Sequence, residues 1–155
     1  MWLEGPGLKA PAAPPRVVLA QEHYQFTRSL LVVPVGTVVE FPNADPDYHN
    51  IFSLSRTKRF DLGRYKKDEA PAPSVRFDTP GLVRLQCEIH APMRAVVRVV
   101  DSPWFTITDD TGQFTLTGLP AGPWTLCAQL DEKNHWKLPV TITAGRTTTA
   151  IFAKP

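Results

Sequence analysis

The sequence predicts an all-β fold, and three observations support this prediction. The first is proline, which supplies 16 of the 155 residues, a density that helix interiors do not tolerate. The second is that no stretch shows apolar residues at a sustained 3.6-residue spacing behind a helix cap. The third is a series of short runs rich in β-branched residues, separated by turn residues. Many short strands at such spacing are typical of a β-sandwich or a barrel.

The strands are expected in two series. The first series is 17–21, 30–33, 37–41, 74–77, 83–87 and 95–100, and the second is 104–108, 113–116, 124–129, 140–143 and 148–152. Within 83–87, Val83, Leu85 and Cys87 share one face and polar residues occupy the other. Cys87 should therefore point inward at the end of a half-buried strand. Cys127 alternates with the polar residues of its strand, so we interpret it as a bystander.

The chain is expected to divide at about residues 101–103. Residues 1–15, rich in Pro, Gly and Ala, should form an extended lead-in. Residues 16–100 form the first β-unit, and 101–155 form a second, smaller one. Because about fifty residues make a poor independent core, we expect the second unit to pack on the first. We also expect it to pair with a strand around residues 2–4.

Composition and charge exclude several classes of protein. Hydrophobic residues make up 43% of the chain and charged residues 21%, so a wholly disordered chain is excluded. The net charge of +2 comes from 17 basic and 15 acidic residues, and these are scattered rather than striped, which argues against nucleic acid as a partner. The best apolar run is broken by Pro34 and Gly36 and is shorter than the roughly 20 residues that span a bilayer. We expect a soluble monomer with no membrane span.

The residue spacing that carries chemistry is Cys-x-x-His-x-x-Met, formed by Cys87, His90 and Met93 directly after a buried strand. Upstream, His49 follows the expected strand 37–41 and its Pro-Asn turn. Two neighbouring strands that end at the same pole of a sandwich would bring His49 against this loop. The combined donors are two imidazole nitrogens, one thiolate and a weak fourth ligand, the thioether.

Two histidines, one cysteine and a long axial methionine are typical of electron-transfer copper sites. The thiolate and the thioether suit Cu(I), and the imidazoles suit Cu(II). Zinc would accept the thiolate and the imidazoles but would gain little from a thioether. The donor set therefore predicts one copper ion that cycles between Cu(I) and Cu(II).

These residues resemble a cupredoxin, of the plastocyanin-like and amicyanin-like kind with a short ligand loop. Residues 35–43 with His49-Asn50 resemble the stretch that leads to the first histidine ligand, and 77–81 resemble the hairpin before the cysteine strand. The resemblance covers about residues 16–100 and implies a Greek-key β-sandwich. It implies His49, Cys87 and His90 as equatorial ligands, Met93 as the axial ligand, and Asn50 as the residue that ties the two ligand loops together.

The resemblance also implies a role, namely one-electron transfer between protein partners in the periplasm, through the exposed edge of His90. A partner would dock near His90, on the small apolar patch 91–93, and Lys66, Lys67 and Arg94 could steer an acidic partner. We expect no enzyme, because four protein ligands leave no position for a substrate. No signal peptide is visible, and we expect that it has been removed.

Two departures from the cupredoxin pattern matter. Ile89 stands where amicyanin-like loops commonly have proline, which removes a backbone N–H, so the donors to the thiolate and the redox potential can differ. Residues 101–155 are absent from a minimal cupredoxin, and their segments 108–114 and 119–126 resemble a carboxypeptidase-regulatory-like β-module. Bacterial chains with this combination often carry the loose label methylamine-utilisation-like, which we do not interpret as a function.

Other interpretations of these residues stay open. Cys87 could be an ordinary core residue or a nucleophile beside His90, although no orienting partner or oxyanion donor can be picked out. A disulfide with Cys127 is disfavoured, because the two side chains are expected to face opposite ways. The copper could serve tolerance or delivery, with electron transfer incidental, or the unit could bind nothing. The remaining histidines, His23 and His135, fall in expected loops.

Overall fold

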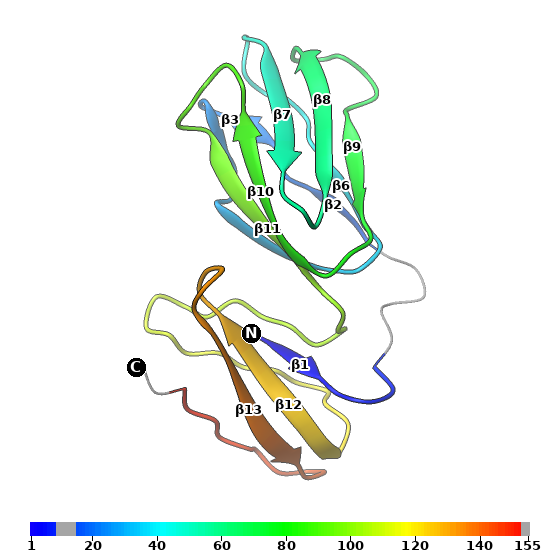
Figure 1. The fold of residues 1–155 in the computed structure, drawn as a ribbon, viewed down its shortest axis with the longest axis vertical. Helices are drawn as coiled ribbons and strands as arrows, with labels where there is room; N and C mark the ends of the chain where they lie inside the picture. The colour runs from blue at the N-terminus through cyan, green and yellow to red at the C-terminus, as the bar shows by residue number, and fades with distance from the viewer. Residues whose placement is uncertain (9–14, 153–155) are drawn as a thin grey trace. The chain divides into compact units, whose positions relative to one another are not determined.

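The computed structural model describes residues 1–8 and 15–152. These residues form two compact units, one of residues 15–100 and one of residues 1–8 with 101–152 (Figure 1). Every regular element among the described residues is a strand, which confirms the predicted all-β class. Accordingly, the described part of the chain contains no helix long and apolar enough to cross a membrane. Residues 9–14 of the predicted lead-in lie outside the described residues.

The larger unit is a sandwich of two sheets. One sheet has the strand order β5-β11-β10-β7-β8, and the other has the order β2-β6-β9. The strands are β2 (Arg16–Val18), β5 (Leu30–Pro34), β6 (Thr37–Glu40), β7 (His49–Leu54), β8 (Arg59–Tyr65), β9 (Ser74–Phe77), β10 (Gly81–Cys87) and β11 (Arg94–Val100). Strand β5 is parallel to β11 and β2 is parallel to β6, whereas the other pairs are antiparallel.

The core of this unit lies between the two sheets. Val83, Leu85 and Cys87 are buried on one face of β10, as predicted. They belong to one apolar cluster with residues of the other sheet, such as Val39 and Phe77, which are both fully buried. Burial of each such large side chain contributes roughly 1.5–3 kcal/mol. This core therefore fixes the strand ends from which the site is built.

His49 comes next to Cys87 because β7 and β10 are neighbours in one sheet. These strands are antiparallel, and Cys87, the last residue of β10, pairs with Ile51. His49 opens β7 two residues before Ile51. The prediction brought His49 in from the end of the strand 37–41, whereas it begins β7, a strand that was not predicted.

The hairpin of β7 and β8 was not predicted. No strand was expected between residues 41 and 74, yet Arg64 and Tyr65 belong to β8 and pair with β7. A signal was available, because Phe60 and Leu62 alternate with charged residues and pack against the core. Gly63 and the bulge in the pairing between Asn50 and Phe52 obscured this alternation.

A small hairpin follows β2 and interrupts the strand predicted at 17–21. It consists of β3 (Gln21–Glu22) and β4 (Gln25–Phe26), which pair antiparallel. Its two-residue turn is His23-Tyr24, and both residues have positive φ angles, 55° and 57°. This is the backbone of a type I′ turn, which favours Asn and Gly. Two bulky residues in this conformation are strained, so other contacts must hold the turn.

The smaller unit contains one three-stranded sheet of β1 (Trp2–Glu4), β12 (Gly122–Gln129) and β13 (His135–Ile142), in the order β1-β12-β13. Leu3 pairs with Leu126, which confirms the predicted pairing with the segment around residues 2–4. Cys127 is buried, so its interpretation as a residue of a polar face was wrong. The reason is that three successive residues of β12, 126–128, are buried and both faces of the strand are covered.

Three strands predicted for the smaller unit do not form. Residues 113–116 and 148–152 are not strands, and 104–108 contributes only an isolated bridge at Phe105. A strand needs a hydrogen-bonded partner, but 113–116 and 148–152 line a cavity of about 980 Å³. The consecutive threonines 147–149 would also place polar side chains on both faces of a strand. Burial of one face would then not select one pairing register over another.

Candidate metal centre

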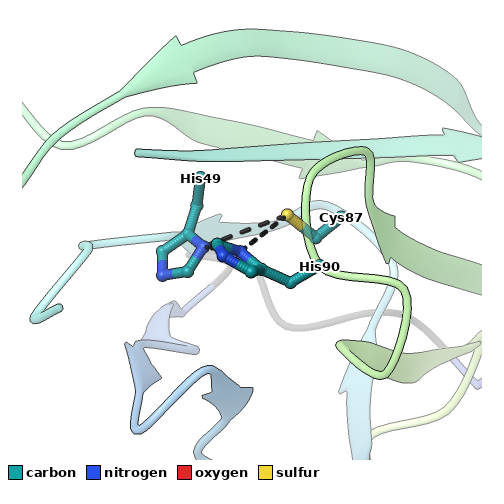
Figure 2. Close-up of side chains that lie close together, drawn as sticks. All are labelled: His49, Cys87 and His90. Atoms are coloured by element: carbon teal, nitrogen blue, oxygen red, sulfur yellow. Dashed lines mark hydrogen bonds between the residues drawn. The ribbon is translucent and has the colours of Figure 1, made fainter. Parts of the chain in front are cut away.

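Three donor atoms converge beside the end of β10, as Figure 2 shows. Nδ1 of His49 lies 3.0 Å from Nδ1 of His90, and Sγ of Cys87 lies 3.9 Å from each nitrogen. In protein sites a metal lies about 2.0–2.1 Å from a histidine nitrogen and about 2.3 Å from a thiolate. One ion can therefore reach all three atoms without any large movement. The structure brings together the three residues predicted as equatorial ligands.

The three residues differ in their access to solvent. His49 is fully buried and Cys87 is nearly so, whereas His90 is partly exposed. The buried pair comes from the paired strands β7 and β10, and His90 comes from the loop after β10. His90 is thus the one of the three whose ring reaches the surface.

Met93 closes the loop after Cys87. Its amide donates to the carbonyl of His90 (2.9 Å), and its carbonyl accepts from the amide of Cys87 (3.3 Å). The Met93 side chain is fully buried in the core cluster, so the prediction that it forms part of an exposed apolar patch 91–93 was wrong. These two hydrogen bonds close the loop between Cys87 and Met93. The thioether of Met93, three residues after His90 in the chain, is buried. The axial role of Met93 stays a prediction.

Asn50 links the two ligand segments through its backbone. Its carbonyl accepts from the amide of Glu88 (3.2 Å), the residue after Cys87. Its side-chain amide donates to Oδ1 of Asp61 (2.6 Å) on β8, and its own Oδ1 is buried with no partner among the described residues. The tie between the loops is thus present, but the side chain binds the neighbouring strand instead of the cysteine loop.

A buried carboxylate stands behind His49. Nε2 of His49 lies 2.9 Å from Oδ2 of Asp45, and both side chains are buried. Burial raises the pKa of Asp45, but hydrogen bonds from the Tyr24 amide, the His49 ring and the His23 amide outweigh it and lower that pKa below its usual value. Because a carboxylate accepts, the ring proton of His49 belongs on Nε2. The lone pair of Nδ1 then points toward Cys87 and His90.

The loop 43–48 places this carboxylate. Oδ1 of Asn43 accepts from the amide of Asp45 (2.9 Å), and Nδ2 of Asn43 donates to the carbonyls of Asp47 (2.8 Å) and Tyr65 (3.2 Å). The sequence identified the Pro-Asn turn here but did not single out Asp45. An Asp four residues before a His carries no signal in a loop, because spacing predicts proximity only in regular elements.

Tyr24 covers part of the site from the β3–β4 turn. Its ring packs edge-on against His90 (centroids 5.1 Å apart) and His49 (6.1 Å). Its hydroxyl donates to Oδ2 of Asp47 (2.7 Å), and this hydrogen bond raises the pKa of Tyr24. Sequence reasoning missed this contact, because it depends on an unpredicted hairpin.

The other histidines, the other cysteine and the basic residues singled out from the sequence are not among the grouped donors. Cys87 and Cys127 are not joined in a disulfide. His23 is in the β3–β4 turn and His135 begins β13, and both are exposed. Of the proposed basic residues, Lys66 lies over the ring of Tyr48 at 4.5 Å, and Lys67 and Arg94 are exposed.

Comparison with solved structures finds copper proteins. A copper-containing nitrite reductase from Thermus scotoductus SA-01 is 26% identical, with a TM-score of 0.51 over 63% of this chain and 25% of its own. A mutant of amicyanin in the oxidised state is 25% identical, with a TM-score of 0.50 over 55% of this chain and 82% of its own. A reduced Cu(I) form of another amicyanin mutant is 23% identical, with a TM-score of 0.50 over 63% and 96%.

These similarities show a cupredoxin fold, as predicted. The chain spans only a quarter of the length of the nitrite reductase. No family model and no curated protein matches the chain. The fold and the converging imidazoles and thiolate together point to a site for one copper ion. The carboxypeptidase-regulatory-like and methylamine-utilisation-like resemblances stay predictions.

Proposed function

We propose that this protein is a type 1 copper protein that carries single electrons between protein partners. The observation that carries the proposal is the convergence of His49, Cys87 and His90 on one point, with Met93 buried in the same loop. A bound copper ion would supply the exchange between Cu(II) and Cu(I). The residues of the chain hold the donors, exclude water and give partners access.

The scaffold supports such a role because it fixes the donors. His49 and Cys87 belong to paired strands of a packed sandwich. The Asn50 carbonyl accepts a hydrogen bond from the amide of Glu88, the residue after Cys87. Donor atoms that already lie 3.0–3.9 Å apart need little rearrangement when the charge of an ion changes. Buried donors also favour retention of the ion, which supports a carrier over a protein that delivers copper.

We further propose that the chain is not an enzyme. With Met93 as the fourth ligand, all positions around the ion would be taken by side chains, and a substrate would find none open.

Electrons would pass at His90, the partly exposed residue of the three. Around it, Ile89, Ala91 and Pro92 are exposed and offer a small apolar surface for a docking partner. The exposed cations Lys67 and Arg94 would add a mild attraction for an acidic partner. We place this exchange in the periplasm, where the resemblance puts such carriers.

The test is addition of Cu(II) to the purified, metal-free protein. We expect an intense visible charge-transfer band with one equivalent of copper and reversible one-electron cycling at an electrode without loss of the ion. Cys87→Ser should abolish the band and Met93→Leu should shift it. Cys127→Ser is the matched control, because it removes the other buried thiol and should leave the band unchanged.

Two outcomes would contradict the proposal. Absence of the band in the wild-type protein would leave no role for copper. Rapid transfer of Cu(I) to a weak chelator would favour copper delivery instead of electron transfer.

A further inference from the structure

One buried charge near the site has no part in holding the ion. Asp45 is 5% exposed, and among the described residues the one side chain that hydrogen-bonds its carboxylate is that of His49. Charged side chains are almost never buried without partners that compensate them. A buried carboxylate whose one side-chain partner is the His49 ring is therefore directed at that ring.

The β3–β4 hairpin is shaped to hold this carboxylate. The amide of His23 donates to Oδ1 of Asp45 (2.8 Å), and the amide of Tyr24 donates to Oδ2 (3.0 Å). Both residues have left-handed backbone conformations, which are strained for residues of this size. The two hydrogen bonds to an ionised carboxylate are strong and explain how the strained turn persists.

A neutral acceptor behind His49 would be enough to fix the ring. A backbone carbonyl or an amide oxygen could accept the Nε2 proton and orient Nδ1 equally well. A carboxylate adds a full negative charge, which a buried environment screens poorly. This charge stabilises a doubly charged cation on the far side of the ring more than a singly charged one.

We propose that Asp45 is a positioning residue that also sets the redox balance, because it fixes the proton of His49 on Nε2 and favours Cu(II) over Cu(I). This inference rests on the proposed function and deepens it. The two effects are separable, since an asparagine keeps an oxygen acceptor but removes the charge.

The first test compares reduction potentials of the copper-loaded wild-type protein, Asp45→Asn and Asp78→Asn, measured by potentiometric titration. Asp45→Asn should reduce the preference for Cu(II) over Cu(I) at least tenfold, a rise of about 59 mV for a one-electron couple. Asp78 is exposed in the same unit and pairs with Arg76, so Asp78→Asn is the matched control and should change the preference less than threefold. Asp45→Glu retains the charge and should stay close to the wild-type protein.

The second test uses the unaltered chain and decides the matter even if Asp45→Asn does not fold. In metal-free protein, ¹⁵N NMR of the His49 ring should place the proton on Nε2. A proton on Nδ1, or a folded Asp45→Asn variant with the wild-type potential, would overturn the inference.

The two proposals fail in distinguishable ways. If the wild-type protein forms no copper band, the proposed function fails. If the band is present but the reduction potential of Asp45→Asn equals that of the wild-type protein, only the proposed role of Asp45 fails.

Discussion

The two units of the chain differ in how their apolar side chains are packed. In the larger unit, two sheets enclose one continuous cluster that includes Phe41, Phe77 and Met93. In the smaller unit, one sheet faces a cavity of about 980 Å³, and its buried apolar residues are few: Trp2, Leu3, Leu126, Cys127 and Ala128. Ile107, Leu130 and Ile151 of this unit are largely exposed.

This difference bears on where the chemistry lies. A site that holds donor atoms at fixed separations needs strand ends that do not move, and such rigidity comes from dense packing on both faces of the strands. The larger unit provides this packing around β7 and β10. The smaller unit has fewer buried contacts, and sparsely packed regions open more readily.

The chain contains its own probes for this comparison. All four tryptophans, at positions 2, 104, 124 and 136, belong to the smaller unit, and all three tyrosines, at 24, 48 and 65, belong to the larger one. Tryptophan fluorescence therefore follows the smaller unit, and the visible copper band follows the larger unit.

The largest effect is expected from the core of the larger unit. Phe77 is fully buried and packs edge-on against Phe60. Phe77→Ala should lower the free energy of unfolding by about 3–5 kcal/mol, and denaturant titration of the copper band would measure it. A loss below about 1 kcal/mol would mean that this core is not tightly packed.

A smaller effect is expected from the matching truncation in the other unit. Leu126 is buried in β12 but lines the cavity, so fewer contacts are lost. Leu126→Ala should cost about 2 kcal/mol, the lower end of the range for such changes. Tryptophan fluorescence during denaturation would report it, and a cost equal to that of Phe77→Ala would refute the contrast between the units.

The smallest effect is expected from the ion pair that joins β1 to β13. Glu4 accepts from Nζ of Lys137 at 2.6 Å. Burial raises the pKa of Glu4, but hydrogen bonds from Lys137 and Trp2 outweigh it and lower that pKa. Both side chains are well exposed, so Glu4→Gln should cost only about 0.2–1 kcal/mol at pH 7.

The pH dependence of this pair has a definite sign. Because the folded state lowers the pKa of Glu4, the stabilisation is present above the unfolded value and disappears as the pH falls through the folded value. The wild-type protein and Glu4→Gln should therefore converge in stability in acid. A difference that grows as the pH falls would contradict this assignment.

Sequence reasoning succeeded where the signal is local. Cys87, His90 and Met93 lie within one loop, and the alternation of Val83 and Leu85 gives the facing of the cysteine. The expectation that two strands end at the same pole of the sandwich connected His49 to this loop, and the family resemblance supported it.

It failed where contacts are set by packing between distant segments. Asp45 and Tyr24 reach the site through a bent loop and a strained hairpin, and neither has a periodic pattern. In the smaller unit, segments 113–116 and 148–152 have strand-like composition but lack a pairing partner. Composition alone cannot supply one.

The most direct measurement of the central claim is X-ray absorption at the copper edge of the loaded protein. If His49, Cys87 and His90 hold one ion, the spectrum will show one short bond to a thiolate sulfur and two bonds to imidazole nitrogens. A copper shell of nitrogen and oxygen atoms alone, with no sulfur, would contradict the account.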